Sequence, residues 1–340
     1  MTSPRSRTFA VELYGFPAAR GRVAIECGDR GFRVAGSAQD FPGIPQVDGT
    51  AFPGFMDSHV HLGLIDRSEL GVSGITRVLD LGWDPIEARQ WAQDDSAGIA
   101  IEYAGAFITA PGGYPVDRAW APPRSTFEVS DAAAAEAAVQ RMSAAGASVI
   151  KVSSNSVAGP VHSDKVLETI VSSAREVGLP VVAHAEGPGE AVRVARAGVS
   201  MLAHAPFSET LSDVTLLTIA DRMTWISTLD IHGWGAPNAD AERAEDNLRR
   251  FVQLGGRVRY GTDLGNGDLP VGVNLREVAA LARAGLTTRQ VIDALLPAPE
   301  RRDLRRLNLL PGSQSSVSGD PAQLQNLSAL TVSNIEEYLQ

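Results

Sequence analysis

The amino-acid sequence predicts an α/β fold: a (β/α)8 TIM barrel with a small β-sandwich formed by the N- and C-terminal segments. From residue 52 onward, strand-like apolar runs alternate with helical segments in about eight units over roughly 250 residues, the length of such a barrel. Before residue 52, short β-like runs are separated by glycine and proline turns. Four of the six histidines end strand-like runs, where a barrel gathers its functional side chains.

The expected elements follow the chain in order. Residues 1–51 form the N-terminal part of the sandwich, with strands near 10–13, 22–25 and 32–34. Residues 52–306 form the barrel, with strands at 52–59, 74–81, 99–108, 148–152, 180–185, 200–203, 224–229 and 257–261. Its helices are expected at 85–93, 131–145, 164–176, 189–197, 211–222, 241–254 and 274–284. Residues 307–340, with β-like runs near 316–318 and 330–332, form the C-terminal part of the sandwich and pair with the N-terminal sheet.

Composition and charge narrow the function classes. A chain of 340 residues with 44% hydrophobic content can bury a large core. Its formal net charge of −10 disfavours nucleic acid or an anionic membrane as a partner. The single cysteine, Cys27, excludes an intrachain disulfide, and Met1 to Phe9 lacks the apolar core of a signal peptide. We expect a cytoplasmic protein, and a homo-oligomer is compatible with the sequence.

The histidines and one lysine carry the chemistry. His59 and His61 lie two residues apart on a strand, so they point the same way and suit a divalent metal such as zinc, although such a pair is more often a structural feature. His184 and His204 each end a later strand, and Asp263 follows the last one. An aspartate there also makes an ordinary helix cap.

Lys151 lies within the apolar run Val149 to Val152. Its charge would be costly there. Three interpretations compete: an ion pair with an acid such as Asp263, a Schiff-base lysine, or a carbamate formed with CO2 that bridges two metals. The four strand-end histidines favour the carbamate.

These motifs together resemble those of the amidohydrolase superfamily, in its imidazolonepropionase-like and prolidase-like branch. The matching stretches are 52–61, 74–82, 108–113, 149–152, 182–187, 202–205, 261–263 and 318–321. The sequence departs from the family pattern at Ala203, where the family often has an acid, in the loop 153–156, and in the short segment 314–317.

The resemblance implies two divalent metal ions, with Zn2+ expected. By position, His59, His61 and Asp263 hold one metal and His184 and His204 the other, with the CO2-derived carbamate on Lys151 between them. A bridging hydroxide would then attack the amide (C–N) bond of a small cyclic amide, N-acyl amino acid, dipeptide or peptide-derived natural product. Asp263 would be the catalytic proton shuttle.

Other functions remain open at this level. A lactonase or phosphoesterase would use the same centre, a deaminase would need one metal, and a non-catalytic scaffold would need none. His232, Tyr114 and His162 lie in loops after strands and are candidates for substrate binding, although His232 is equally compatible with the surface. Glu186 is expected to be a solvated loop acid.

Overall fold

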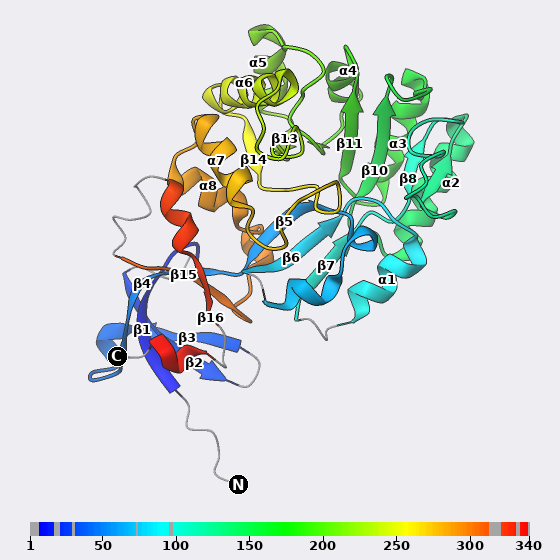
Figure 1. The fold of residues 1–340 in the computed structure, drawn as a ribbon. Coiled ribbons are helices and arrows are strands. Elements are labelled where there is room, and N and C mark those ends of the chain that lie inside the picture. The colour runs from blue at the N-terminus through cyan, green and yellow to red at the C-terminus, as the bar shows by residue number, and fades with distance from the viewer. Residues whose placement is uncertain are drawn as a thin grey trace.

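The computed structural model describes residues 7–16, 21–28, 31–72, 74–94, 98–312, 321–330 and 334–338. The strands of this part of the chain form three sheets: one of six strands, and two parallel sheets of seven and three strands (Figure 1). Helices cover the parallel sheets, whereas the six-stranded sheet lies to one side of them (Figure 1). The predicted alternation of parallel strands and helices is therefore confirmed.

The six-stranded sheet is built from both ends of the chain, as the sequence predicts. Its strands are β1 (Arg7–Leu13), β2 (Arg22–Gly28), β3 (Gly31–Ser37), β4 (Gln46–Pro53), β15 (Leu307–Leu310) and β16 (Ser328–Leu330), in the order β16-β15-β4-β1-β2-β3. Strand β15 runs antiparallel to β4, with Leu307 opposite Pro53. The β-like run predicted near 316–318 lies outside the described residues, and β15 was not predicted. A sandwich-like sheet thus joins the two ends of the chain.

The predicted first barrel strand, 52–59, is wrong at its start. Phe52 and Pro53 end β4, and the parallel strand β5 begins at Phe55. Gly54 separates the two, and a Cβ atom at this position would lie 1.8 Å from Oγ1 of Thr76, so only glycine fits there.

The two parallel sheets hold the remaining strands. The three-stranded sheet contains β5 (Phe55–Val60), β6 (Ile75–Asp80) and β7 (Ala100–Tyr103). The seven-stranded sheet contains β8 (Phe107–Thr109), β9 (Thr126–Glu128), β10 (Ile150–Asn155), β11 (Val181–Glu186), β12 (Met201–Leu202), β13 (Thr224–Ile226) and β14 (Arg257–Arg259).

All seven expected helices are present, and an eighth follows them. The α-helices are α1 (Pro85–Gln93), α2 (Ala132–Ala145), α3 (Asp164–Glu176), α4 (Glu190–Arg196), α5 (Asp213–Ala220), α6 (Ala239–Gln253), α7 (Leu275–Arg283) and α8 (Thr288–Leu295). Short 3-10 helices include Ala38–Asp40, Leu62–Leu64, Arg67–Val72, Pro299–Arg301, Pro321–Asn326 and Ile335–Tyr338. Helix α2 begins as predicted, because the side chain of Asp131 accepts from the backbone N–H of Ala134, and it ends at Gly146 in the left-handed conformation.

Backbone hydrogen bonds join the two parallel sheets. Ser58 donates to the carbonyl of Tyr260 at 3.0 Å, and Asp263 donates to the carbonyl of His59 at 2.8 Å. The side chain of Asp57 accepts from the backbone N–H of Thr262 at 3.0 Å and from its hydroxyl at 2.6 Å. These bonds place the residues after β14 directly beside β5, which brings Asp263 to the two histidines.

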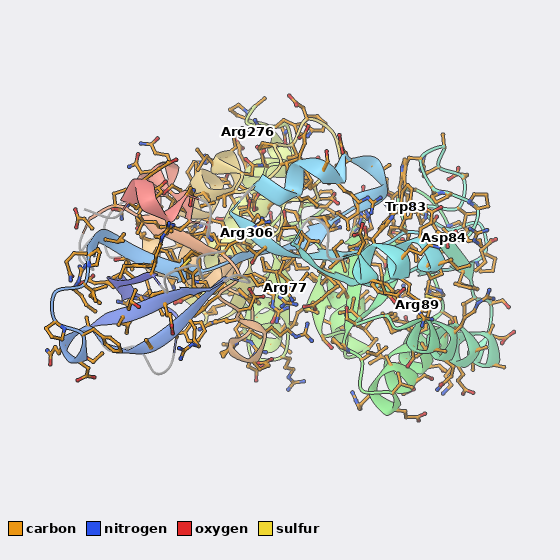
Figure 2. The ribbon with its side chains drawn as sticks, turned by 90° about the horizontal axis from the view of Figure 1, so that it is seen from below. Arg77, Trp83, Asp84, Arg89, Arg276 and Arg306 are labelled. Carbon is orange, nitrogen blue, oxygen red and sulfur yellow. The ribbon has the colours of Figure 1, made fainter. Side chains whose placement is uncertain are left out.

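An ion-pair network lies where the six-stranded sheet meets the α/β part (Figure 2). Arg77 on β6 binds Glu102 on β7 at 2.9 Å and donates to the carbonyl of Arg301 at 3.1 Å. Because residues 301–303 lead into β15, these contacts fix the return of the chain to the six-stranded sheet. No helix among the described residues has both the length and the apolar character needed to cross a membrane.

Candidate metal centre

Eight of the nine predicted site residues line one cavity of about 330 Å3. All six predicted metal ligands line it: His59, His61, Lys151, His184, His204 and Asp263. Two of the three predicted substrate-binding residues, Tyr114 and His232, line it as well. The strands explain this convergence, because successive strands of a parallel sheet end at the same edge.

An apolar cluster shares the inward faces of these strands. Val149 on the β10 side and Val182 on β11 belong to a buried cluster that also contains Met56 and Ile226. Each valine lies two residues before a site residue, Lys151 or His184, so valine and site residue lie on the same face of the strand. The polar side chains of the site therefore lie next to a layer of buried apolar side chains.

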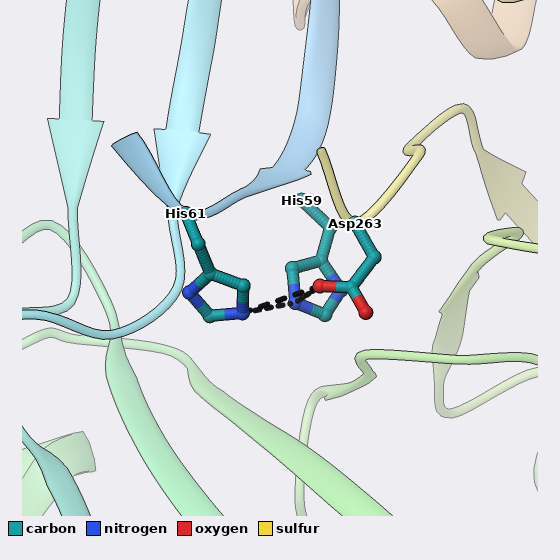
Figure 3. A group of neighbouring side chains, drawn as sticks. All are labelled: His59, His61 and Asp263. Atoms are coloured by element: carbon teal, nitrogen blue, oxygen red, sulfur yellow. Dashed lines mark hydrogen bonds and ion pairs between the residues drawn. The ribbon is translucent and has the colours of Figure 1, made fainter. Parts of the chain in front are cut away.

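His59, His61 and Asp263 form the tightest cluster (Figure 3). The Nε2 atoms of the two histidines are 3.3 Å apart. Oδ1 of Asp263 lies 3.0 Å from Nε2 of His59 and 3.2 Å from Nε2 of His61. All three side chains are buried. His59 lies in β5, and His61 is the first residue after its C-terminal end.

Hydrogen bonds on the far side of each ring decide which nitrogen faces the cluster. Nδ1 of His59 lies 2.9 Å from the carbonyl of Ala203, and Nδ1 of His61 lies 3.3 Å from the carbonyl of Gly82. A carbonyl can only accept, so each Nδ1 carries the proton of a neutral imidazole. Each Nε2 then presents a lone pair to the carboxylate of Asp263.

Three electron-pair donors at these distances repel one another unless a cation lies among them. Adding a second proton to His59 would relieve the repulsion, but burial lowers the pKa of His59 to about 4. Oδ1 of Asp263 is buried and has no hydrogen-bond donor among the described residues. Two imidazoles and a carboxylate are ligands that zinc accepts, so this donor set fits a divalent cation.

His184 and His204 form a second pair beside the first. Nδ1 of His184 lies 3.0 Å from Nε2 of His204, and the rings of His204 and His59 are 4.8 Å apart between centroids. Nδ1 of His204 is 2.8 Å from the hydroxyl of Thr228. Burial lowers the pKa of His204 well below its usual value, so its imidazole is neutral and can bind a metal.

Lys151 is buried among these histidines. Burial lowers the pKa of its amine to about 7, and the charges of Asp263 and Asp80 offset part of that effect. In the part of the chain that the structure describes, Lys151 forms no ion pair. The ion-pair interpretation therefore finds no support, whereas a neutral amine is the form that adds CO2.

Two non-glycine residues at the site have left-handed backbones. Asp263 has φ of 60° and Thr228 has φ of 42°. Aspartate tolerates this region, but a β-branched threonine is strained there. The strained residue is the one that contacts Nδ1 of His204.

The predicted substrate-binding residues differ in position. Tyr114 stacks on His184 with centroids 5.1 Å apart, and His232 packs on Phe207 at 4.4 Å. Burial lowers the pKa of His232 to about 4, and its Nε2 has no hydrogen-bond partner among the described residues. His162 is buried but does not line the cavity.

Sequence reasoning missed several residues of the cavity. Phe107, Arg118 and Phe207 line it, as do Asn155 and Glu186. Glu186 is only partly solvated, because its Oε2 accepts from Asn155 at 2.6 Å and lies 3.1 Å from Nε2 of His184. Its position two residues after His184, on the same face of β11, was the available signal.

No protein-family model matches the chain, and no curated protein matches it. Solved structures do. The chain is similar to a Xaa-Pro dipeptidase with bound methionine in the active site, with a TM-score of 0.73 and 20% identity over 94% of this chain and 96% of that one. It is also similar to molinate hydrolase (TM-score 0.70, 15% identity, 96% and 94% covered) and to A. niger ochratoxinase (TM-score 0.68, 16% identity, 96% and 95% covered). The chain thus shares its fold with these solved structures.

Proposed function

We propose that this chain is a metal-dependent amidohydrolase that cleaves the C–N bond of an amide in a small-molecule or short-peptide substrate. The convergence of two oriented imidazole lone pairs and a buried carboxylate carries the proposal. The three named neighbours, a dipeptidase and two hydrolases, share the fold and support the reaction class.

The chain supplies ligands for two divalent cations, with Zn2+ best suited to the imidazole-rich donor set. His59, His61 and Asp263 would hold one cation, and His184 and His204 the other. Lys151, as a carbamate, would supply an anionic oxygen to both. Bound cations would act as Lewis acids on water and on the substrate carbonyl.

The protein's own groups handle the proton and the substrate. Asp263 faces the cavity and would accept the proton of the attacking water and return it to the leaving nitrogen. Its Oδ2 is held by the amide of Asn266 at 2.8 Å, which keeps the carboxylate aimed at the cavity. His232 and Tyr114 would contact the substrate, and Phe107 and Phe207 give the cavity an aromatic wall.

A cavity of about 330 Å3 can hold a group of the size of an N-acyl amino acid, a dipeptide or a small cyclic amide. Arg118 at the rim is suited to an anionic group of the substrate. A long peptide would not fit within it.

The architecture belongs to the same proposal. The three-stranded and seven-stranded sheets, joined by the bonds of Ser58 and Asp263, would together form a closed barrel. Residues 52–306 would make up that barrel domain, and residues 1–51 and 307–340 the small β domain.

The test is a metal titration followed by a substrate panel. Metal-depleted protein should bind about two equivalents of Zn2+, and the loaded protein should hydrolyse the amides in a panel of dipeptides, N-acyl amino acids, cyclic amides, lactones and phosphoesters. His59→Ala should lose metal and turnover, whereas Glu176→Ala, an exposed carboxylate on α3, should retain both. Failure to bind metal, or turnover confined to lactones or phosphoesters, would overturn the assignment.

A further inference from the structure

Among the four histidines predicted as metal ligands, only His184 has Nδ1, rather than Nε2, facing a neighbouring imidazole. Its Nδ1 lies 3.0 Å from Nε2 of His204, whereas its Nε2 faces away, toward Glu186 and Asn155. Nδ1 can bind a cation only if the ring proton is on Nε2. The groups around Nε2 therefore decide whether the second metal position can form.

Two groups compete for Nε2 of His184. Oε2 of Glu186, at 3.1 Å, can only accept, so it favours a proton on Nε2. Nδ2 of Asn155, at 3.2 Å, can only donate, so it favours a lone pair there.

The backbone fixes the orientation of the Asn155 amide. Its Oδ1 accepts from the backbone N–H groups of Val157 at 3.1 Å and Ala158 at 2.9 Å. The amide therefore cannot flip, and its Nδ2 must face Glu186 and His184. It donates to Oε2 of Glu186 at 2.6 Å.

We infer that Glu186 is a positioning residue that sets the tautomer of His184 against the competing amide of Asn155. A carboxylate bonded to the imidazole outcompetes a neutral amide, because hydrogen bonds to an ionised acceptor are about twice as strong as neutral ones. His184 then carries its proton on Nε2 and presents the Nδ1 lone pair beside His204. This inference extends the proposed metal centre by naming what orients one of its ligands.

The first test needs no variant. In metal-free protein with 15N-labelled histidine, the imidazole nitrogen shifts of His184, assigned by comparison with His184→Gln, should show a proton on Nε2. A proton on Nδ1 in the wild-type protein would overturn the inference. This measurement involves neither metal nor substrate, so it stands even if the chain hydrolyses no amide.

The variants separate the two competing groups. Glu186→Ala leaves Asn155 as the only partner of Nε2, so the proton should move to Nδ1 and Co2+ binding should weaken by about 10- to 100-fold. Asn155→Ala removes the competing donor and should keep the proton on Nε2. Glu186→Gln replaces the ionised acceptor with a neutral amide, so the preference for a proton on Nε2 should weaken, and the exposed Glu176→Ala is the matched control.

A Glu186→Ala protein with unchanged tautomer and unchanged Co2+ affinity would also overturn the inference. If Glu186 instead contacts only the substrate, its removal should change KM while the tautomer and the visible spectrum of the Co2+ form stay the same. That result would contradict the positioning role.

Discussion

Lys151 shows how strongly the surroundings of one residue can change its chemistry. It is fully buried beside four histidines, and its pKa is lowered to about 7, so much of it is a neutral amine near neutral pH. A neutral buried amine is a nucleophile toward CO2, and the resulting carbamate would replace a costly cation with a metal ligand.

Lys151→Ala should therefore lose at least one metal and most of the turnover. Metal content by atomic spectroscopy and the hydrolysis rate measure these losses. A 13C NMR signal from protein equilibrated with labelled bicarbonate should be present in the wild type and absent from the variant. Full metal content with full activity in Lys151→Ala would refute the bridging role.

Asp263→Asn should preserve the fold and abolish most of the activity. Asparagine tolerates the left-handed backbone at this position, so unfolding is not expected. It cannot take up a proton, so kcat should fall by about 10^2- to 10^4-fold. Circular dichroism and steady-state kinetics are the measurements, and a rate within about twofold of wild type would remove the proton-shuttle role.

At the scale of single elements, α7 is anchored by a buried acid. Glu277 accepts from the backbone N–H of Asp230 at 2.8 Å, and Asn274 begins the helix as its N-cap. Burial raises the pKa of Glu277 to about 7. The folded state therefore binds a proton more tightly than the unfolded state does.

The free energy of unfolding should accordingly fall as the pH rises from about 4.5 to about 7, because the folded protein must then give up a proton that it retains better. The contribution of Glu277 is up to about 3 kcal/mol. Glu277→Gln, which keeps an acceptor for Asp230, should reduce this pH dependence in urea unfolding at several pH values. Glu176→Gln, on the exposed face of α3, should leave the pH dependence of unfolding unchanged. If the carboxyl of Glu277 titrates normally, Glu277→Gln will leave the pH dependence unchanged as well, which would contradict this prediction.

Periodic elements could be predicted from the sequence, whereas elements defined by their partners could not. Helices α1 and α3 match their predicted ranges, because caps and apolar spacing are local signals. Helix α8 was missed although Thr287 and Gln290 form a capping box. The three-residue strand β9 is defined by its pairing with β8, and no local sequence pattern predicts such a strand.

The same distinction applies to the site. His184, His204 and Asp263 could be placed because strand ends converge in any such sheet. The role of Glu186 could not, since it depends on the orientation of Asn155 at the end of β10, which the loop after this strand fixes. Loops take their geometry from tertiary contacts that the sequence does not display.

At the scale of the whole molecule, the six-stranded sheet connects the two ends of the chain. Six apolar side chains from the described part of the C-terminal segment are buried: Leu307, Leu309, Leu310, Leu324, Leu330 and Ile335. At about 2 kcal/mol for each, their burial is comparable with the total stability of a typical domain.

Removal of residues 307–340 should therefore prevent stable folding and leave β4 as an open edge that promotes aggregation. Expression yield, size-exclusion chromatography and thermal unfolding are the measurements. Leu309→Ala in the full chain should cost about 2–4 kcal/mol and remain folded, which calibrates the larger deletion. A truncated monomer with the wild-type melting temperature would contradict this role.

The bond between Asp57 and Thr262 spans 205 positions of the chain. During translation, His59 leaves the ribosome long before Asp263 does, so a nascent chain cannot assemble this three-residue cluster. Any cation held by all three side chains must therefore be acquired after residue 263 has been synthesised, and chains that stop before this residue could not hold it in the same way.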